Sequence, residues 1–168
     1  MARVMQIDRR TLLGLGAAGA VAGFAILWPV GRSADAQPAR FRFRLTDAEW
    51  RRRLGAQRYA ILRQAATERP GSSPLDREHR RGTFACAGCN QALFPSTTKF
   101  DSGTGWPSFF RPLPNAVVTR TDSTLGIQRT EVLCANCGGH LGHVFNDGPR
   151  PTGLRYCMNG LAMTFRAA

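Results

Sequence analysis

Acidic residues and lysine are scarce in this sequence. Its 168 residues contain 11 Asp and Glu against 23 Lys and Arg, for a formal net charge of +12, and Lys99 is the only lysine. Such a surplus of positive charge can indicate binding to nucleic acid or to an anionic membrane surface. However, the arginines are scattered apart from Arg51–Arg53 and Arg80–Arg81, and no stripe combines basic with aromatic residues. The charge is therefore typical of a solvated face, and we expect no nucleic-acid partner.

One long apolar run without charged side chains, Thr11–Val30, lies near the N-terminus. It follows Arg9-Arg10 and precedes Ala34-Asp35-Ala36, which together give the charged region, apolar region and small-residue cleavage site of a secretory signal. The paired arginines resemble the twin-arginine type. An uncleaved anchor facing the periplasm is the alternative, because the run approaches the about 20 residues that a membrane span needs. Its interruptions favour cleavage: Gly14, Gly16, Gly19, Gly23 and Pro29.

This pattern predicts three parts of the chain. Residues 1–36 are expected to be the signal peptide, 37–44 a loose lead-in segment, and 45–168 one folded domain. The mature protein is expected in the periplasm as a monomer, with membrane contact only through the export signal.

Two short helices are expected at the start of the domain. Thr46 and Glu49 have the spacing of a capping box, and a helix from there should end at Leu54 because Gly55 can adopt a left-handed conformation. A second helix over Gln57–Ala66 is indicated by apolar residues at helical spacing.

Short β-prone runs separated by turn residues follow Gly82. They predict antiparallel sheets that close into a barrel or form a sandwich. Asp122–Gly126 is typical of a hairpin turn between two of the strands. The expected strands are Thr83–Ala85, Ala92–Phe94, Ala116–Thr121, Ile127–Leu133, His143–Phe145, Leu154–Asn159 and Leu161–Phe165.

Four of the five cysteines form two Cys-x-x-Cys pairs, Cys86 with Cys89 and Cys134 with Cys137. Two intervening residues let both sulfurs of a tight turn face one ion, and two such turns supply the four thiolates of a structural zinc site. Two disulfides are the alternative, because cysteines of exported proteins are usually oxidised. Export of a folded, metal-loaded protein by the twin-arginine route favours zinc. Neither pair is followed directly by histidine, so covalent haem attachment is not indicated.

The fifth cysteine, Cys157, stands alone in a β-prone run. Strand alternation places Arg155, Cys157 and Asn159 on one face. A guanidinium beside a thiol favours the thiolate, which is the nucleophile, and the Asn159 amide can hold a substrate oxygen. The alternative is a buried core cysteine in an ordinary strand.

Two of the three histidines, His140 and His143, come directly after the second cysteine pair. A histidine can deliver a proton to a departing oxygen near neutral pH, and His143 would share a strand face with Phe145. A structural role is the alternative, including one histidine on zinc, although four cysteines already suffice for the metal. Trp106 follows two closely spaced glycines on a loop, where its indole can bind a sulfur substituent or serve as a core anchor.

In their order along the chain, these motifs resemble the B-type peptide-methionine (R)-S-oxide reductases, enzymes that each reduce one epimer of methionine sulfoxide. The resemblance implies a mainly β fold, with two antiparallel sheets in a barrel-like arrangement, short N-terminal helices and a zinc-binding double knuckle. The matching stretches are Thr46–Trp50, Leu62–Pro70, Cys86–Phe94, Lys99–Phe109, Cys134–Gly153 and Arg155–Phe165.

The same resemblance implies a role for each site residue. Cys157 would be the nucleophile that becomes a sulfenic acid, with Arg155 supporting its thiolate. Oxidised proteins or peptides would be the substrates, and an external thiol such as a thioredoxin-like protein the reductant. The remaining assignments are Cys86, Cys89, Cys134 and Cys137 for structural zinc, His140, His143 and Asn159 around the sulfoxide oxygen, and Trp106 and Phe145 for substrate binding.

Three positions depart from the family pattern. Thr104 stands where many members have a cysteine that resolves the oxidised nucleophile, Gly160 replaces the usual serine after Asn159, and the loop Gly71–Leu75 lacks the aromatic residues common there. Two other functions are alternatives to the reductase: a zinc-ribbon nucleic-acid binder, and a zinc module without turnover in which Cys157 is inert.

Overall fold

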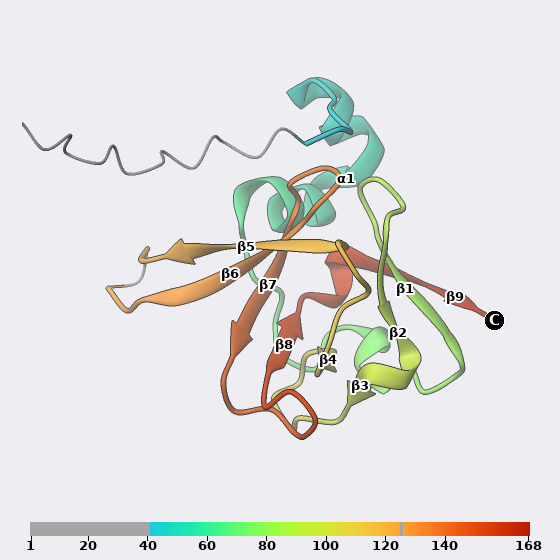
Figure 1. Ribbon diagram of the computed structural model, residues 1–168. Coiled ribbons are helices and arrows are strands. Elements are labelled where there is room, and N and C mark those ends of the chain that lie inside the picture. The colour runs from blue at the N-terminus through green and yellow to red at the C-terminus, as the bar shows by residue number, and fades with distance from the viewer. Residues whose placement is uncertain (1–40, 125) are drawn as a thin grey trace, which may run out of the picture. The chain divides into compact units, whose positions relative to one another are not determined.

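The structure, a computed structural model, describes residues 41–124 and 126–168 (Figure 1). The predicted signal peptide, residues 1–36, lies outside the described residues, as does the first half of the lead-in segment. No helix in the described part of the chain is long and apolar enough to cross a membrane.

The helix α1 (Asp47–Gln64) begins and bends where the sequence predicts. The Glu49 amide donates to the Thr46 hydroxyl, and the Glu49 carboxylate accepts from the Thr46 amide at 2.7 Å, which confirms the capping box. Gly55 has φ 66° and divides α1 into the two predicted helical segments. The second segment ends at Gln64, two residues before the predicted end, because Ala65 is left-handed.

The lead-in segment is packed from Phe41 onward rather than loose. The Phe43 amide donates to the Asn136 carbonyl at 2.9 Å, and the Phe43 ring lies 5.7 Å from the Trp50 ring on α1. The segment before the helix therefore connects α1 to the turn that carries the second cysteine pair.

A three-stranded antiparallel sheet has the order β2-β1-β9, with β1 (Gly82–Cys86), β2 (Ala92–Pro95) and β9 (Met163–Ala167). The last strand begins two residues later than predicted, because Gly160–Ala162 forms the 3-10 turn η3. Two further 3-10 turns, η1 (Pro74–Arg77) and η2 (Ser96–Thr98), lie in the loops on either side of β1 and β2.

A six-stranded antiparallel sheet has the order β3-β4-β8-β7-β6-β5. The predicted strands are confirmed, although β7 begins three residues before the predicted His143 and β8 ends one residue before the predicted Asn159. The two-residue strands β3 and β4 were not predicted because they are too short to show alternation. The barrel-like arrangement is not confirmed, because within the described residues neither sheet closes on itself. The edge strands of the six-stranded sheet are β3 and β5. The strands are β3 (Lys99–Phe100), β4 (Ser108–Phe109), β5 (Val117–Asp122), β6 (Arg129–Cys134), β7 (His140–Phe145) and β8 (Arg155–Met158).

Aromatic side chains fill the space between the two sheets. Phe94 of β2 stacks on Phe109 of β4 with ring centroids 4.3 Å apart, and Phe84 of β1 meets the same ring edge-on at 4.9 Å. All three are fully buried, so each contributes about 1.5–3 kcal/mol of hydrophobic stabilisation. Leu62 of α1 joins this core, and α1 packs against β7 (Figure 1).

Candidate active site and metal centre

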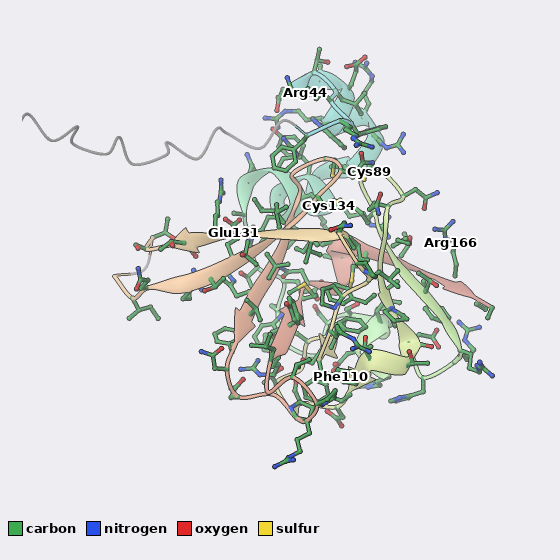
Figure 2. All side chains as sticks on the ribbon, viewed as in Figure 1. Arg44, Cys89, Phe110, Glu131, Cys134 and Arg166 are labelled. Atoms are coloured by element: carbon green, nitrogen blue, oxygen red, sulfur yellow. The ribbon has the colours of Figure 1, made fainter. Side chains whose placement is uncertain are left out.

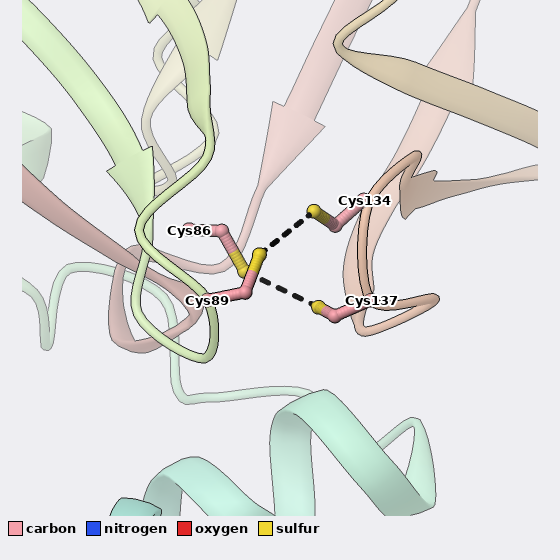
Figure 3. A group of neighbouring side chains, drawn as sticks. All are labelled: Cys86, Cys89, Cys134 and Cys137. Atoms are coloured by element: carbon pink, nitrogen blue, oxygen red, sulfur yellow. Dashed lines mark hydrogen bonds between the residues drawn. The ribbon is translucent and has the colours of Figure 1, made fainter. Parts of the chain in front are cut away.

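The two Cys-x-x-Cys segments fold into turns of the same geometry. In the first, the Asn90 amide donates to the Cys86 carbonyl at 2.8 Å; in the second, the Gly138 amide donates to the Cys134 carbonyl at 2.8 Å. Cys86 ends β1 and Cys134 ends β6, so each sheet supplies one turn. Figure 2 labels Cys89 and Cys134, one from each turn, and Figure 3 shows the sulfurs of the two turns facing one another.

The sulfur positions fit one tetrahedral metal ion. The Sγ atoms are 3.7 Å apart for Cys86 and Cys137 and 3.5 Å apart for Cys89 and Cys134, and all four ligand atoms lie within 4.8 Å of one another. A tetrahedron with zinc–sulfur bonds of about 2.3 Å has edges of about 3.8 Å. These separations are too long for disulfides, whose sulfurs lie about 2.05 Å apart, and the cysteines are free.

The electrostatics of the crowded thiols also favour a cation between them. Hydrogen bonds to Cys134 and then Cys137 lower the pKa of Cys89, whereas hydrogen bonds to the same two groups raise the pKa of Cys86. Neighbouring thiolates repel one another, so they do not all ionise together without a positive ion between them. The residues present therefore fit a metal held by four thiolates.

Cys157 lies in the middle of the six-stranded sheet. Its strand neighbours are Ser108 of β4 on one side and His143 of β7 on the other. Two residues along the strand, Arg155 pairs with Phe145, and its guanidinium lies 4.5 Å from the Phe145 ring centre. Directly opposed residues share a face of the sheet, so the predicted shared face is confirmed for Arg155 and Cys157. The third predicted member, Asn159, follows the last residue of β8 and is not part of the strand.

A pocket opens on this face, and Cys157 is half-buried in its wall. The pocket brings together five of the predicted site residues. Trp106 and Cys157 are only partly buried, which argues against the alternative that they are core residues. Its lining residues are Thr67, Trp106, Arg129, Gly142, His143, Phe145, Cys157 and Asn159.

His140 and Arg155 do not line this pocket. Arg155 makes a two-point ion pair with Asp147, with N–O distances of 2.9 and 2.7 Å. This hydrogen bonding raises the pKa of Arg155, and the neighbouring Cys157 adds a smaller effect in the same direction. His140 is buried, and its Nδ1 lies 2.6 Å from a Glu131 carboxylate oxygen.

A bulge in β7 places both histidines on one face. Leu133 pairs with His140 and Val132 with Gly142, so Leu141 is the extra residue. Without it, residues 140 and 143 would point to opposite faces; with it, their rings lie 5.5 Å apart. Gly142 allows β7 to approach β8, because a Cβ there would lie 2.1 Å from the Cys157 carbonyl oxygen.

An aspartate holds the second histidine. His143 Nε2 lies 2.8 Å from Asp122 Oδ2, and the same oxygen accepts from the Arg129 guanidinium at 2.6 Å. Hydrogen bonds from Thr124, followed by the one to His143, lower the pKa of Asp122. Because an ionised carboxylate can only accept, His143 carries a proton on Nε2, which leaves Nδ1 as the nitrogen able to exchange a proton.

Comparison with known proteins decides the family. The SelR domain matches residues 54–167. "Peptide methionine sulfoxide reductase MsrB" of Agrobacterium fabrum is 56% identical over 121 residues, which is 71% of this chain and 90% of that protein. The protein of the same name from Leifsonia xyli is 54% identical over 134 residues, 79% of this chain and 96% of that protein. A third, from Leptospira interrogans, is 51% identical over 122 residues, 72% of this chain and 93% of that protein.

The chain belongs to the MsrB family. Its activity is peptide methionine sulfoxide reduction, as the resemblance of the motifs implies. The two alternatives without this activity, a nucleic-acid binder and an inert zinc module, are therefore wrong.

Several residues that support the site of the reductase were missed from the sequence. Asp122 was assigned only to a hairpin turn, and Glu131 to an ordinary strand position. Their closeness to the histidines depends on the register of β5, β6 and β7 and on the bulge, neither of which has a local signal in the sequence. One signal in the sequence could have indicated these residues. Arg129 and Glu131 alternate with Thr130, which puts two charged side chains on one face of a strand whose last four residues are buried.

The position of Thr104 agrees with the departure noted in the sequence. Its hydroxyl lies 3.8 Å from Cys157 Sγ and 2.8 Å from the Ser102 hydroxyl, which in turn lies 2.7 Å from the buried Ser108 hydroxyl. On this side of the pocket a hydroxyl rather than a thiol therefore lies within hydrogen-bonding distance of Cys157 Sγ.

Proposed function

We propose that the reductase returns the R-epimer of methionine sulfoxide in proteins to methionine, with Cys157 as the nucleophile. The observation that carries this proposal is the register of β7 and β8, which sets His143 directly opposite Cys157. Both residues line the pocket that has the Trp106 indole as its aromatic wall. Trp106 would bind the methyl group on sulfur, and Asn159 and His143 would bind the oxygen.

The chemistry is a two-electron transfer. The Cys157 thiolate bonds to the sulfoxide sulfur, the oxygen takes a proton from His143, and the oxygen passes to Cys157 as methionine leaves. The sulfoxide is reduced to methionine by two electrons, and Cys157 is oxidised to a sulfenic acid. The Asp122 carboxylate stabilises the His143 imidazolium before the proton is given.

An external thiol would close the cycle. Four of the five cysteines belong to the metal cluster and Thr104 lies beside Cys157, so the sulfenic acid has no free internal partner. A first external thiol displaces water to give a mixed disulfide, and a second releases the Cys157 thiol and an external disulfide. A thioredoxin-like protein or a small thiol would serve.

The decisive experiment uses separated R- and S-sulfoxide peptides without reductant. One equivalent of methionine per chain should form from the R-epimer, and dimedone should then label Cys157, as measured by mass spectrometry. Equal reduction of both epimers would contradict the stereochemistry. A disulfide between Cys157 and a cluster cysteine would contradict the need for an external thiol.

The ion that we propose for the four-thiolate cluster is zinc. Cys86, Cys89, Cys134 and Cys137 would hold it in closed coordination, with no open position for substrate. Bound there, zinc supplies folding energy rather than chemistry. It would tie the end of β1 to the end of β6, one from each sheet.

We further propose that the reductase is exported through its twin-arginine motif and repairs oxidised proteins outside the cytoplasm. The support is the sequence of residues 1–36 alone. An Arg9→Lys, Arg10→Lys double variant should keep the precursor in the cytoplasm, whereas wild type should reach the periplasm with a new N-terminus at Gln37. Cell fractionation and N-terminal sequencing measure both, and export of the double variant through the route for unfolded chains would contradict the twin-arginine assignment.

A further inference from the structure

Glu68 is a buried carboxylate that none of the preceding steps uses. Its residue exposure is 7%, and no ion pair among the described residues includes it. A buried carboxylate is costly unless its oxygens are hydrogen-bonded. Its two oxygens accept from the backbone amides of Gly160, at 2.5 Å, and Leu161, at 2.8 Å. The side chain thereby holds the chain immediately after Asn159.

The backbone of the same residue reaches two walls of the pocket. The Glu68 amide donates to Asn159 Oδ1 at 3.0 Å, and the Glu68 carbonyl accepts from the Trp106 indole nitrogen at 3.2 Å. Trp106 and Asn159 come from different loops, and both line the pocket. Glu68 is therefore bonded to the aromatic wall and to the amide at once.

These bonds also decide which way the Asn159 amide faces. Because Oδ1 accepts from the Glu68 amide, Nδ2 is the group that donates to the Leu141 carbonyl, at 3.2 Å. An amide nitrogen carries two protons, so one N–H remains for an oxygen bound in the pocket. With the amide reversed, two donors would face each other at Glu68 and an acceptor would face the substrate oxygen.

We propose that Glu68 is a positioning residue, which sets the separation between the Trp106 wall and the Asn159 donor so that the methyl group and the oxygen of a sulfoxide bind together. This inference rests on the proposed roles of those two residues in reduction. A chiral sulfur is recognised only if nucleophile, methyl site and oxygen site are all fixed. Glu68, which touches no substrate, would thus control epimer choice and substrate affinity.

The test compares Glu68→Gln with Glu49→Gln. Glutamine keeps the size of the Glu68 side chain but replaces one carboxylate oxygen by an NH2 group. That group cannot accept from the backbone amide of Gly160 or Leu161. KM for the R-sulfoxide peptide should rise about tenfold, as expected when a charge-assisted hydrogen bond is weakened, and binding of the S-epimer as an inhibitor should be less affected. Alkylation of Cys157 by iodoacetamide should keep its wild-type rate. Glu49, an exposed capping carboxylate bonded to a backbone amide, provides the matched control, whose KM should not change.

A double-mutant cycle tests whether Glu68 acts through Trp106. Trp106→Phe removes the indole N–H that donates to the Glu68 backbone carbonyl. If the Glu68 carboxylate holds that carbonyl in place, the effect of Trp106→Phe on KM should be smaller in the Glu68→Gln background than in wild type. Independent effects, or a loss of thermal stability with KM unchanged, would reduce Glu68 to a structural role and overturn the proposal. If Glu68→Gln does not fold, Glu68→Asp, with a shorter carboxylate, replaces it in the same cycle. Absence of methionine formation by wild type would instead contradict the proposed function.

Discussion

The metal centre and the active pocket are built from the chain in opposite ways. The four cysteines come from two turns of identical hydrogen bonding, each closed within six residues. The pocket draws Thr67, Trp106, Arg129, His143 and Cys157 from separate loops and strands. The local Cys-x-x-Cys spacing therefore specifies each half of the metal centre separately. The pocket, in contrast, forms only when β4, β8 and β7 pair in the correct register.

The largest effect that distinguishes the two regions should come from removing a metal ligand. Cys134→Ser leaves three thiolates at the cluster. Because structural-zinc binding contributes about 10–16 kcal/mol at neutral pH, the domain should unfold rather than remain folded with slower turnover. Circular dichroism melting and metal analysis of the purified protein measure this. A folded wild-type protein that contains no metal and two disulfides would contradict the assignment.

The same substitution in the pocket should act on chemistry alone. Cys157→Ser should abolish methionine formation, because a serine hydroxyl is too weak a nucleophile toward a sulfoxide. Cys157 is half-buried and makes no bond to the cluster, so metal content and melting temperature should stay near wild type. Turnover that survives in Cys157→Ser would show that the nucleophile lies elsewhere, and parallel loss of metal would dissolve the distinction between the two regions.

The support of the pocket should show a smaller effect with a pH signature. Asp122→Asn keeps a hydrogen-bond acceptor for His143 but removes the charge that stabilises its imidazolium. Single-turnover reduction should fall by about tenfold to a hundredfold, less than the 10²–10⁴ that a lost general acid can cost. Asp47→Asn, the same change at an exposed ion pair with Arg51, should leave the rate unchanged.

The sign of the stability effect follows from the lowered pKa of Asp122. A carboxyl whose folded-state pKa is lowered stabilises the fold above its unfolded value of about 4, and this contribution is lost as the pH falls through the folded value. Asp122→Asn should therefore be less stable than wild type at neutral pH, and the difference should shrink in acid. An equal difference at all pH values would mean that packing, not charge, is responsible.

The two regions also show how far the sequence can predict. Both cysteine turns, the bend at Gly55 and the face shared by Arg155 and Cys157 follow from local spacing, and the structure confirms each of them. The contacts of Asp122 with His143 and of Glu68 with Gly160 join residues 21 and 92 positions apart in the chain. The open sheets and the two-residue strands β3 and β4 likewise depend on strand pairing rather than on local alternation. The bulge at Leu141 is the sharpest case, because one extra residue moves His140 to the face of His143.

The smallest expected effect concerns two departures from the family pattern that the structure places side by side. A Cβ on Gly160 would lie 1.9 Å from the Ser73 hydroxyl oxygen and 2.4 Å from Ser73 Cβ. Ser73 is buried, and its hydroxyl accepts from the Leu75 amide at 3.2 Å. The loop Gly71–Leu75 therefore fills the space that the usual serine side chain after Asn159 would occupy.

Restoring that serine should be harmful alone and tolerated when the loop is changed with it. Gly160→Ser should destabilise the metal-loaded protein by about 1–3 kcal/mol, as overpacking does, and Ser73→Gly should recover part of the loss because it vacates the same space. Denaturant unfolding of the two single variants and the double variant measures the coupling, which should reach about 1 kcal/mol for side chains in contact. Ser72→Gly is the matched control, since the hydroxyl of this exposed neighbour bonds only locally to the Arg69 carbonyl; it should recover nothing. If the effects of Ser73→Gly and Gly160→Ser simply add, the loop does not substitute for the missing side chain.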